Sequence, residues 1–276
     1  MFTFNSIEPQ LRSPGAGEVW KTLDLSHELP PESTGAIIQI QNTDVSFPRH
    51  CGLRKPGSTV EVIGDLNHGN YTWGLVGCDA DRKIEAFAPT FATMLYWVMG
   101  YTGRNVHFLD TAIEFALVQQ VWQDLDCSPY IPANADAAIF NLSCLAAAYG
   151  KYAIRKKGSA DVHYAYFGQN FPILGLDANM KAEIWPLGVG VSRIRCFLTG
   201  YIVGGITMHT NSIDISPAVL GSWQSGIISA YNDTTHFAII ETAGEAVPQP
   251  WGIRKGGSLR PILGNIRDHQ WAYPHC

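Results

Sequence analysis

The chain has 276 residues with a net charge of −5, a hydrophobic content of 46% and a charged content of 16%. This hydrophobic content is that of a folded protein, and the negative charge gives no support for electrostatic binding to nucleic acid. The longest apolar run, from Phe91 to Val98, is far shorter than the about 20 residues that a membrane-spanning helix needs.

The N-terminal segment from Met1 to Ser6 has neither a basic start nor an apolar core, so it does not resemble a signal peptide. We therefore expect assembly in a cytoplasm rather than ordinary secretion. The low charged content predicts surfaces that other subunits cover, and hence a homo-oligomer.

A pentapeptide that occurs three times organises the chain. The sequence RKPGS at residues 54–58 recurs as RKKGS at 155–159 and as RKGGS at 254–258, with separations of 155 − 54 = 101 and 254 − 155 = 99 residues. A fixed period of this length predicts tandem repeats. We divide the chain into repeats at residues 1–103, 104–204 and 205–276, and expect each to bury its own core.

Each repeat begins with an arm that we expect to be extended. In the second repeat the arm at residues 111–120 has helix propensity, but its counterparts contain Pro9, Pro14 and Pro217, which a helix interior does not tolerate. Residues 141–148 also look helical alone, whereas their counterpart in the first repeat is strand-like, so a strand is predicted there too.

Short alternating apolar runs follow the arm. In the first repeat they lie at residues 35–41, 51–54, 60–63, 71–76, 83–87 and 93–98, with Pro-, Gly-, Asn- or Asp-rich turns between them. About seven short strands with turn signals roughly every 8 to 12 residues are typical of an antiparallel sandwich. We predict an all-β fold of tandem antiparallel β-sandwich repeats with a truncated third copy.

The pentapeptide itself is predicted to be a turn. Its Gly would take a positive φ, and its Ser would hydrogen-bond the local backbone. The Arg would point to the opposite face from the apolar residue before it, and would pair with Asp79 or Asp177 of the same repeat or with a neighbouring chain. The alternative is a site for a carboxylate or phosphate beside the basic pair.

Tryptophans divide into two groups. Trp20, Trp122 and Trp223 hold one place in the repeat, which points to core or inter-repeat packing. Trp97, Trp185 and Trp251 lack such equivalents, and together with Trp271 they are the residues that we predict to lie at an interface.

Cysteine replaces bulky apolar residues between repeats: Cys127 stands where the first repeat has Leu25, and Cys78 where the second has Leu176. This substitution predicts reduced thiols in the core. Cys276, at the end of the sequence, has no such assignment.

The sequence lacks the common motifs for catalysis and metal binding. The nine histidines form no HExxH or His-x-His pair, and no Gly-x-Ser-x-Gly or phosphate-binding loop occurs. We therefore predict a non-enzymatic protein with no catalytic, cofactor-binding or metal-binding residues. The enzymatic alternative, a glycan-cleaving enzyme, would need two carboxylates that face each other across a groove.

The third repeat has only five residues after Trp271, where the first continues for 103 − 73 = 30 residues after Trp73. Such a sandwich would have open edges, so another chain is expected to cover it, for example by adding a strand. In the alternative, it is a smaller sandwich that the second repeat shields.

Three sequence patterns carry a resemblance to a known group of proteins. They are Trp20 to Ser26, Leu53 to Ser58 and Val76 to Ala80, together with their copies in the second repeat. These units resemble β-sandwich repeats of tailed-bacteriophage virion proteins of the fibre, tail, collar or capsid-decoration type. The resemblance covers most of the first two repeats and the start of the third.

The resemblance implies a structural component of a phage particle that is assembled in the host cytoplasm and contacts other virion proteins, without nucleic acid or membrane as partners. The main alternative is a receptor- or carbohydrate-binding adhesin. A scaffold would bury its unmatched aromatic residues between subunits, whereas an adhesin would expose them together at one distal end.

Overall fold

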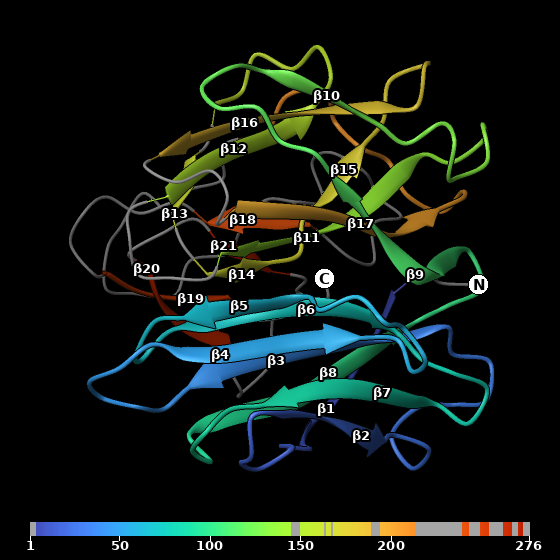
Figure 1. The fold of residues 1–276 in the computed structure, drawn as a ribbon. Coiled ribbons are helices and arrows are strands. Elements are labelled where there is room, and N and C mark those ends of the chain that lie inside the picture. Colours follow the sequence, from blue (N-terminus) through green and yellow to red (C-terminus); the bar gives the residue numbers. More distant parts are fainter. Residues whose placement is uncertain are drawn as a thin grey trace.

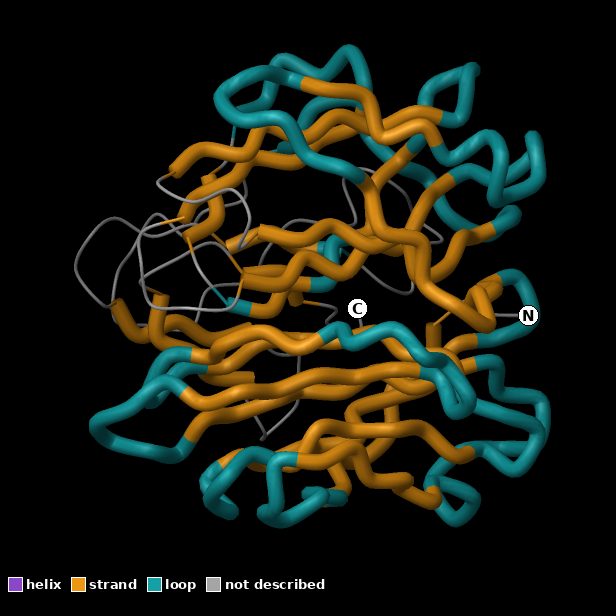
Figure 2. Tube along the Cα trace, viewed as in Figure 1, coloured by secondary structure: helices purple, strands orange, loops and turns teal. Residues whose placement is uncertain are grey.

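The computed structural model describes residues 4–144, 150–162, 164–166, 168–188, 194–213, 239–242, 249–253, 262–266 and 270–272. Every regular element in these ranges is a β-strand (Figures 1 and 2), which confirms the predicted all-β class. Because this part of the chain contains no helix, it also contains no apolar helix long enough to cross a membrane.

Eight strands build the first sandwich. They are β1 (Phe4–Leu11), β2 (Val19–Asp24), β3 (Gly35–Asn42), β4 (Arg49–Arg54), β5 (Ile63–Leu66), β6 (Tyr71–Gly77), β7 (Lys83–Ala88) and β8 (Met94–Thr102). One sheet has the order β1-β8-β3-β6 and the other β2-β7-β4-β5. Successive strands alternate between the two sheets except at the β4–β5 hairpin, which is the arrangement of a double-sheet jelly roll.

The same order recurs in the second sandwich. Its strands are β9 (Val106–Phe115), β10 (Gln123–Asp126), β11 (Ala137–Cys144), β12 (Gly150–Lys156), β13 (Tyr164–Tyr166), β14 (Gln169–Asn170), β15 (Ile173–Gly175), β16 (Lys181–Gly188) and β17 (Ile194–Ile202). One sheet is β14-β11-β17-β9, with β15 also on β11, and the other is β10-β16-β12-β13. The counterpart of β6 is split into β14 and β15 at Pro172, which cannot donate a backbone hydrogen bond.

Two segments that had helix propensity are strands. β9 includes the first part of the arm at residues 111–120, and β11 runs through Cys144. Extended structure is therefore confirmed at residues 111–115 and 141–144, whereas the arm ends in a turn at residues 119–120. Tertiary pairing with β17 on both strands overrides the local helix propensity.

The two sandwiches pack through their inner sheets, defined here as the sheets that contain β3 and β11. Figure 1 shows the two bodies stacked one above the other. The β3 strand is buried on both faces, because Ile38 and Ile40 lie in the core of the first sandwich while Ile37 lies in a separate core between the sandwiches. Leu75 and Ile139 belong to that same inter-sandwich core.

Each sandwich has a core of its own, and one residue of the second sandwich also completes the core of the first. Phe171 of the second repeat is 1% exposed and lies in the hydrophobic core of the first sandwich. Gly74 lies next to it, and a Cβ at that position would be 2.4 Å from Leu53 Cδ1 and 3.3 Å from the Phe171 ring. Thr72 Oγ1 donates a 2.5 Å hydrogen bond to the Gln169 carbonyl beside it.

The described part of the third repeat contains four short strands: β18 (Ile240–Thr242), β19 (Gln249–Ile253), β20 (Ile262–Ile266) and β21 (Gln270–Ala272). Glu241 pairs with Trp271 in β18–β21, as Gln39 pairs with Trp73 in β3–β6. The β19–β20 pair likewise keeps the register of β4–β5. The repeat boundaries at residues 103 and 204 and the truncation of the third repeat stay predictions.

Five of the six cysteines lie in the described residues, and all five are buried and outside any disulfide, as predicted. Cys127 and Leu25, which occupy matching places, are both fully buried. Burial raises the pKa of the Cys127 thiol to about 12 and the pKa of Cys196 well above its ordinary value. Cys276 lies outside the described residues.

We expect these five thiols to be unreactive in the folded chain. In a Cys276→Ser variant, a thiol-specific reagent at pH 8 should label almost nothing before unfolding and five thiols per chain in denaturant, because burial suppresses the thiolate. Prompt labelling of the native variant would contradict the placement of these cysteines in the core.

Candidate interaction surface

The repeated pentapeptide forms the predicted turn in both described copies. Gly57 and Gly158 each have a φ of +84°, which favours glycine. The Ser58 amide donates a hydrogen bond to the Lys55 carbonyl over 3.1 Å, and the Ser159 turn is the same. Ser159 Oγ also accepts a hydrogen bond from the Asp161 amide over 3.0 Å. The third copy lies outside the described residues.

The arginine of each turn has a different partner from the one predicted. Arg54 pairs with Glu85 over 2.5 Å, and Arg155 pairs with Glu183 over 2.9 Å. Each pair joins directly opposed residues on neighbouring strands. Asp79 instead accepts backbone hydrogen bonds in its own turn, including one from Lys83 over 2.8 Å.

Each of these arginines also lies over a tryptophan ring. The guanidinium carbon of Arg54 is 4.2 Å from the Trp20 ring centroid, and that of Arg155 is 3.8 Å from Trp122. We call these two assemblies the Trp–Arg stacks. Gly52 makes room for the first of them, because a Cβ there would lie 2.8 Å from the Trp20 ring.

Of the two roles predicted for these tryptophans, core packing or inter-repeat packing, the Trp–Arg stacks correct the first, since each stack lies outside a core and within one repeat. Trp20 and Trp122 are half-buried, and each shares a face of its sheet with charged residues. Trp20 Nε1 donates a 2.6 Å hydrogen bond to Glu61, whose side chain is 57% exposed. An arginine that stacks on an aromatic ring explains why a tryptophan is kept at this place outside the core. Trp223 lies outside the described residues.

The four predicted interface tryptophans are spread over four strands. Trp97 in β8 and Trp185 in β16 are half-buried. Trp251 lies in β19 opposite Gly264, and Trp271 lies in β21 opposite Glu241. Their role at an interface stays a prediction.

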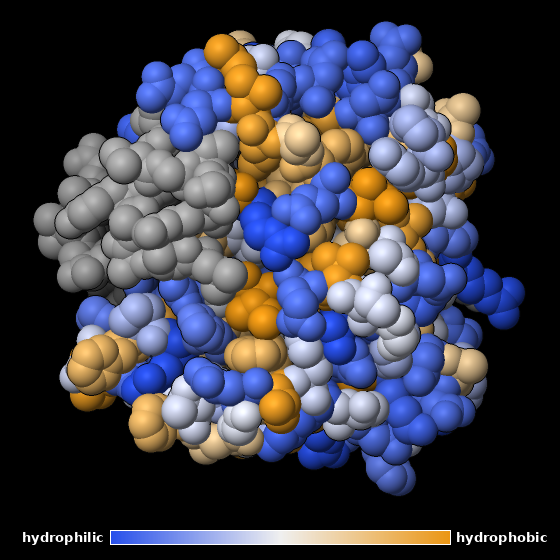
Figure 3. Space-filling model, in the orientation of Figure 1, coloured by the Kyte–Doolittle hydropathy of each residue, from blue (hydrophilic) through white to orange (hydrophobic). Residues whose placement is uncertain are grey.

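A different set of apolar residues is exposed at one end of the first sandwich. Val45 and Phe47, in the β3–β4 loop, are 87% and 61% exposed, and Phe91, in the β7–β8 loop, is 55% exposed. We call these three residues the loop tip. The β3–β4 loop projects at the left of Figure 1, and Figure 3 shows apolar surface at that corner.

Hydrogen bonds hold the loop tip in shape. The Asp44 carboxylate accepts hydrogen bonds from the Ser46 amide over 2.9 Å and from the Phe47 amide over 3.0 Å, and it pairs with Arg49. The Thr43 amide and hydroxyl both donate to the Thr93 carbonyl, which joins the two loops. The exposed rings are therefore presented by a preorganised backbone.

Arg49 lies between the two aromatic residues of the loop tip. Its guanidinium carbon is 5.6 Å from the Phe47 ring centroid and 4.7 Å from that of Phe91. Since Asp44 neutralises Arg49, the loop tip combines aromatic rings with a paired charge. Sequence reasoning missed this site, although two phenylalanines in turn segments rather than strands were an available signal.

The loop tip should loosen in acid. The backbone hydrogen bond from Ser46, followed by Arg49, lowers the pKa of Asp44. A lowered folded pKa means that the stabilisation is present above the ordinary pKa, near 4, and is lost as the pH falls through the folded value. Hydrogen exchange at Ser46 and Phe47, corrected for intrinsic rates, should therefore speed up as the pH falls through the lowered pKa of Asp44. An Asp44→Asn variant should lack this pH dependence; an identical acid response would contradict the assignment.

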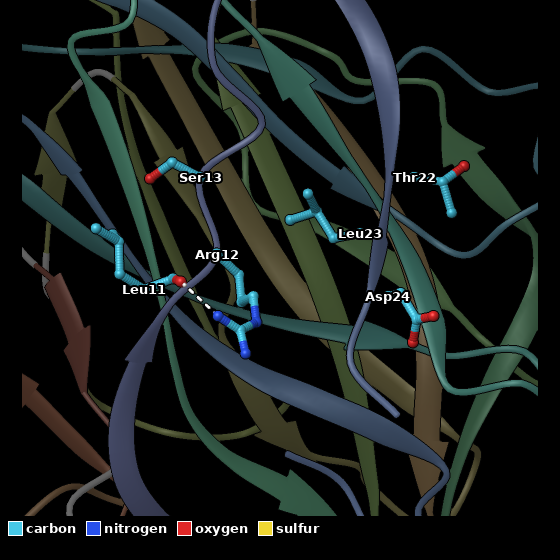
Figure 4. Close-up of a pocket in the computed structure, with 6 residues that line it drawn as sticks. All are labelled: Leu11, Arg12, Ser13, Thr22, Leu23 and Asp24. Atoms are coloured by element: carbon cyan, nitrogen blue, oxygen red, sulfur yellow. Dashed lines mark hydrogen bonds between the residues drawn. The ribbon is translucent and has the colours of Figure 1, made fainter. Parts of the chain in front are cut away.

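A shallow hollow lies beside the end of β1. It has a volume of about 440 Å³ and is lined by Leu11, Arg12, Ser13, Thr22, Leu23 and Asp24 (Figure 4). Arg12 points across it, and its guanidinium pairs with Glu28 and donates to the Leu11 carbonyl over 3.1 Å. Asp24 is the one acidic residue of this lining, so the lining lacks the facing carboxylates that glycan cleavage needs.

Within the described ranges, no three His, Cys, Asp or Glu side chains gather into a potential metal site. No family model matches the chain, and no curated protein shows significant sequence similarity to it.

Proposed function

We propose that the chain is a non-enzymatic structural component of a bacteriophage particle, of the capsid-decoration or tail, fibre or collar type, and that it acts through contacts with other virion proteins. The observation that carries the proposal is the loop tip, where Phe47 and Phe91 flank Arg49 on a rigid backbone. Aromatic residues and arginine are enriched among the residues that contribute most to protein–protein binding.

The fold supports this proposal by analogy. Double-sheet jelly rolls occur in viral capsid proteins, and also in lectins and cupins. Because one fold hosts many functions, the analogy alone decides little. It gains weight from the packing of the two sandwiches, since two jelly rolls that share core residues form a stiff body suited to permanent assembly.

The proposal is tested on purified particles from the source culture. Quantitative mass spectrometry of density-gradient fractions should find the chain in constant ratio to the major capsid protein. Replacing the native gene with a Phe47→Asp, Phe91→Asp version should reduce that ratio at least tenfold. The chain remaining in the soluble fraction, with none in the particles, would refute the proposal.

An adhesin is the second candidate, and one observation favours it. Phe47 and Phe91 are exposed together at one end of a sandwich, where sugar rings stack on aromatic side chains in a binding site. A glycan array read with labelled chain separates the candidates. Saturable binding that Phe47→Ala abolishes would support the adhesin, whereas the virion role predicts no glycan signal.

A further inference from the structure

The inter-sandwich core contains residues from all three repeats at matching positions. Ile37, Ile139 and Ile239 all contribute to it, at spacings of 139 − 37 = 102 and 239 − 139 = 100 residues. A second set, Phe4, Val106 and Ile206, contributes with the same spacings of 102 and 100. Two independent triplets with identical spacing place the three repeats around one common apolar centre.

The same kind of contact forms between the first and second repeats and between the second and third. Phe108 of the second repeat lies on the paired glycines Gly35 and Gly77, where a Cβ would be 2.5 Å from it. One period later, Met208 lies on Gly175, where a Cβ would be 2.6 Å away. The third repeat therefore approaches the second as the second approaches the first.

When the same head-to-tail contact relates each repeat to the next, the repeats form either a closed ring or an open helix. In an open array, the third repeat would meet only the second. The third repeat instead contributes Ile206, Met208 and Ile239 to the core that includes Phe4 and Ile37 of the first, and β21 packs near β6 of the first sandwich. The three repeats therefore close into a ring, in which the third repeat contacts the first.

We infer that this one chain is a closed ring with pseudo-threefold symmetry, and that its partner is three copies of one protein, each bound to the outer surface of one repeat. The Trp–Arg stacks mark that surface, because they recur at matching places on the sheets that face away from the common centre. The sequence keeps a tryptophan and an arginine, Trp223 and Arg254, at the third place. The partner's identity as a virion protein rests on the proposed function, whereas the ring does not.

The ring is tested by measuring distances between pairs of spin labels in the full chain. Thr59 and Ala160 are exposed and follow the repeated Ser of the pentapeptide, and Leu259 follows it in the third copy. Spin labels are attached to pairs of cysteines at these positions in a Cys276→Ser background. We expect three equal distances. A distance between positions 59 and 259 about twice that between 59 and 160 would indicate a linear array and overturn the inference.

The partner is tested by cross-linking purified particles. The protein cross-linked to photo-reactive residues introduced at Glu61 and Val162, which are exposed and 162 − 61 = 101 residues apart, should be one species, through the same residue of that species, in a ratio of three copies per chain. Trp20→Ala should lower the ratio to two and Trp20→Phe should restore it, while Phe115→Ala serves as the control. A ratio of one refutes the threefold partner. A chain absent from particles refutes the virion role, while equal spin-label distances would still establish the ring.

Discussion

Replacement of Phe171 by alanine should cost about 3 to 5 kcal/mol of unfolding free energy. The side chain is 1% exposed and lies among core residues of a sandwich to which it does not belong in sequence. Its removal leaves a cavity next to Gly74 that backbone movement cannot fill cheaply. Chemical denaturation followed by tryptophan fluorescence measures the loss.

The matched control is Phe91→Ala, which deletes the same phenyl group from a side chain that is 55% exposed. It should cost less than about 1 kcal/mol, because little apolar area returns to water. Equal losses for Phe171→Ala and Phe91→Ala would show that Phe171 does not fill a core.

Replacement of Trp73 by alanine should have an effect of similar size, about 3 to 5 kcal/mol. Trp73 is 2% exposed and belongs to the core between the sandwiches. The loss should therefore weaken the attachment of the second sandwich to the first as well as the first sandwich itself. Differential scanning calorimetry should show a melting temperature lowered by roughly 10 °C.

Trp20→Ala is the control for this experiment. It also deletes an indole, but from a half-buried position on the face of a sheet that carries Arg54 and Glu85. We expect its loss to be less than half that of Trp73→Ala, since the stack with Arg54 contributes about 0.5 to 2 kcal/mol. A larger loss for Trp20→Ala would contradict the placement of the two tryptophans.

The local features of the fold were predictable from the sequence because they depend on few residues. A Gly followed by Ser after a basic pair predicted the positive φ at Gly57 and Gly158. Cysteine in the place of leucine predicted burial at Cys127. Comparison between repeats also predicted strands rather than helices for β9 and β11. If the copies share one conformation, a proline in one copy excludes a helix in all of them.

Pairing partners were harder to predict, because they depend on strand register. Arg54 was expected to pair with Asp79, but the register places Glu85 directly opposite Arg54, while the backbone of its own turn occupies Asp79. A shared place in the repeat predicts core or inter-repeat packing for Trp20 and Trp122, whereas repetition equally preserves a stack outside the core.

Contacts between repeats were beyond sequence reasoning. Phe171 differs from its counterpart Trp73 in the core that it fills, and only the relative placement of the sandwiches decides this. The loop tip was missed for a related reason: Phe47 and Phe91 lie 44 residues apart (91 − 47 = 44) and meet only because the β3–β4 and β7–β8 loops end at the same edge of the sandwich.

Native-state hydrogen exchange of the wild-type chain and the Phe171→Ala variant tests most directly whether the second sandwich completes the core of the first. Exchange is compared at the amides of β4 and β6, near Leu53 and Gly74, and at those of β12 and β16. We predict that the variant loses protection in β4 and β6 at least as strongly as in β12 and β16. Loss confined to β12 and β16, with β4 and β6 as protected as in the wild type, would contradict a shared core.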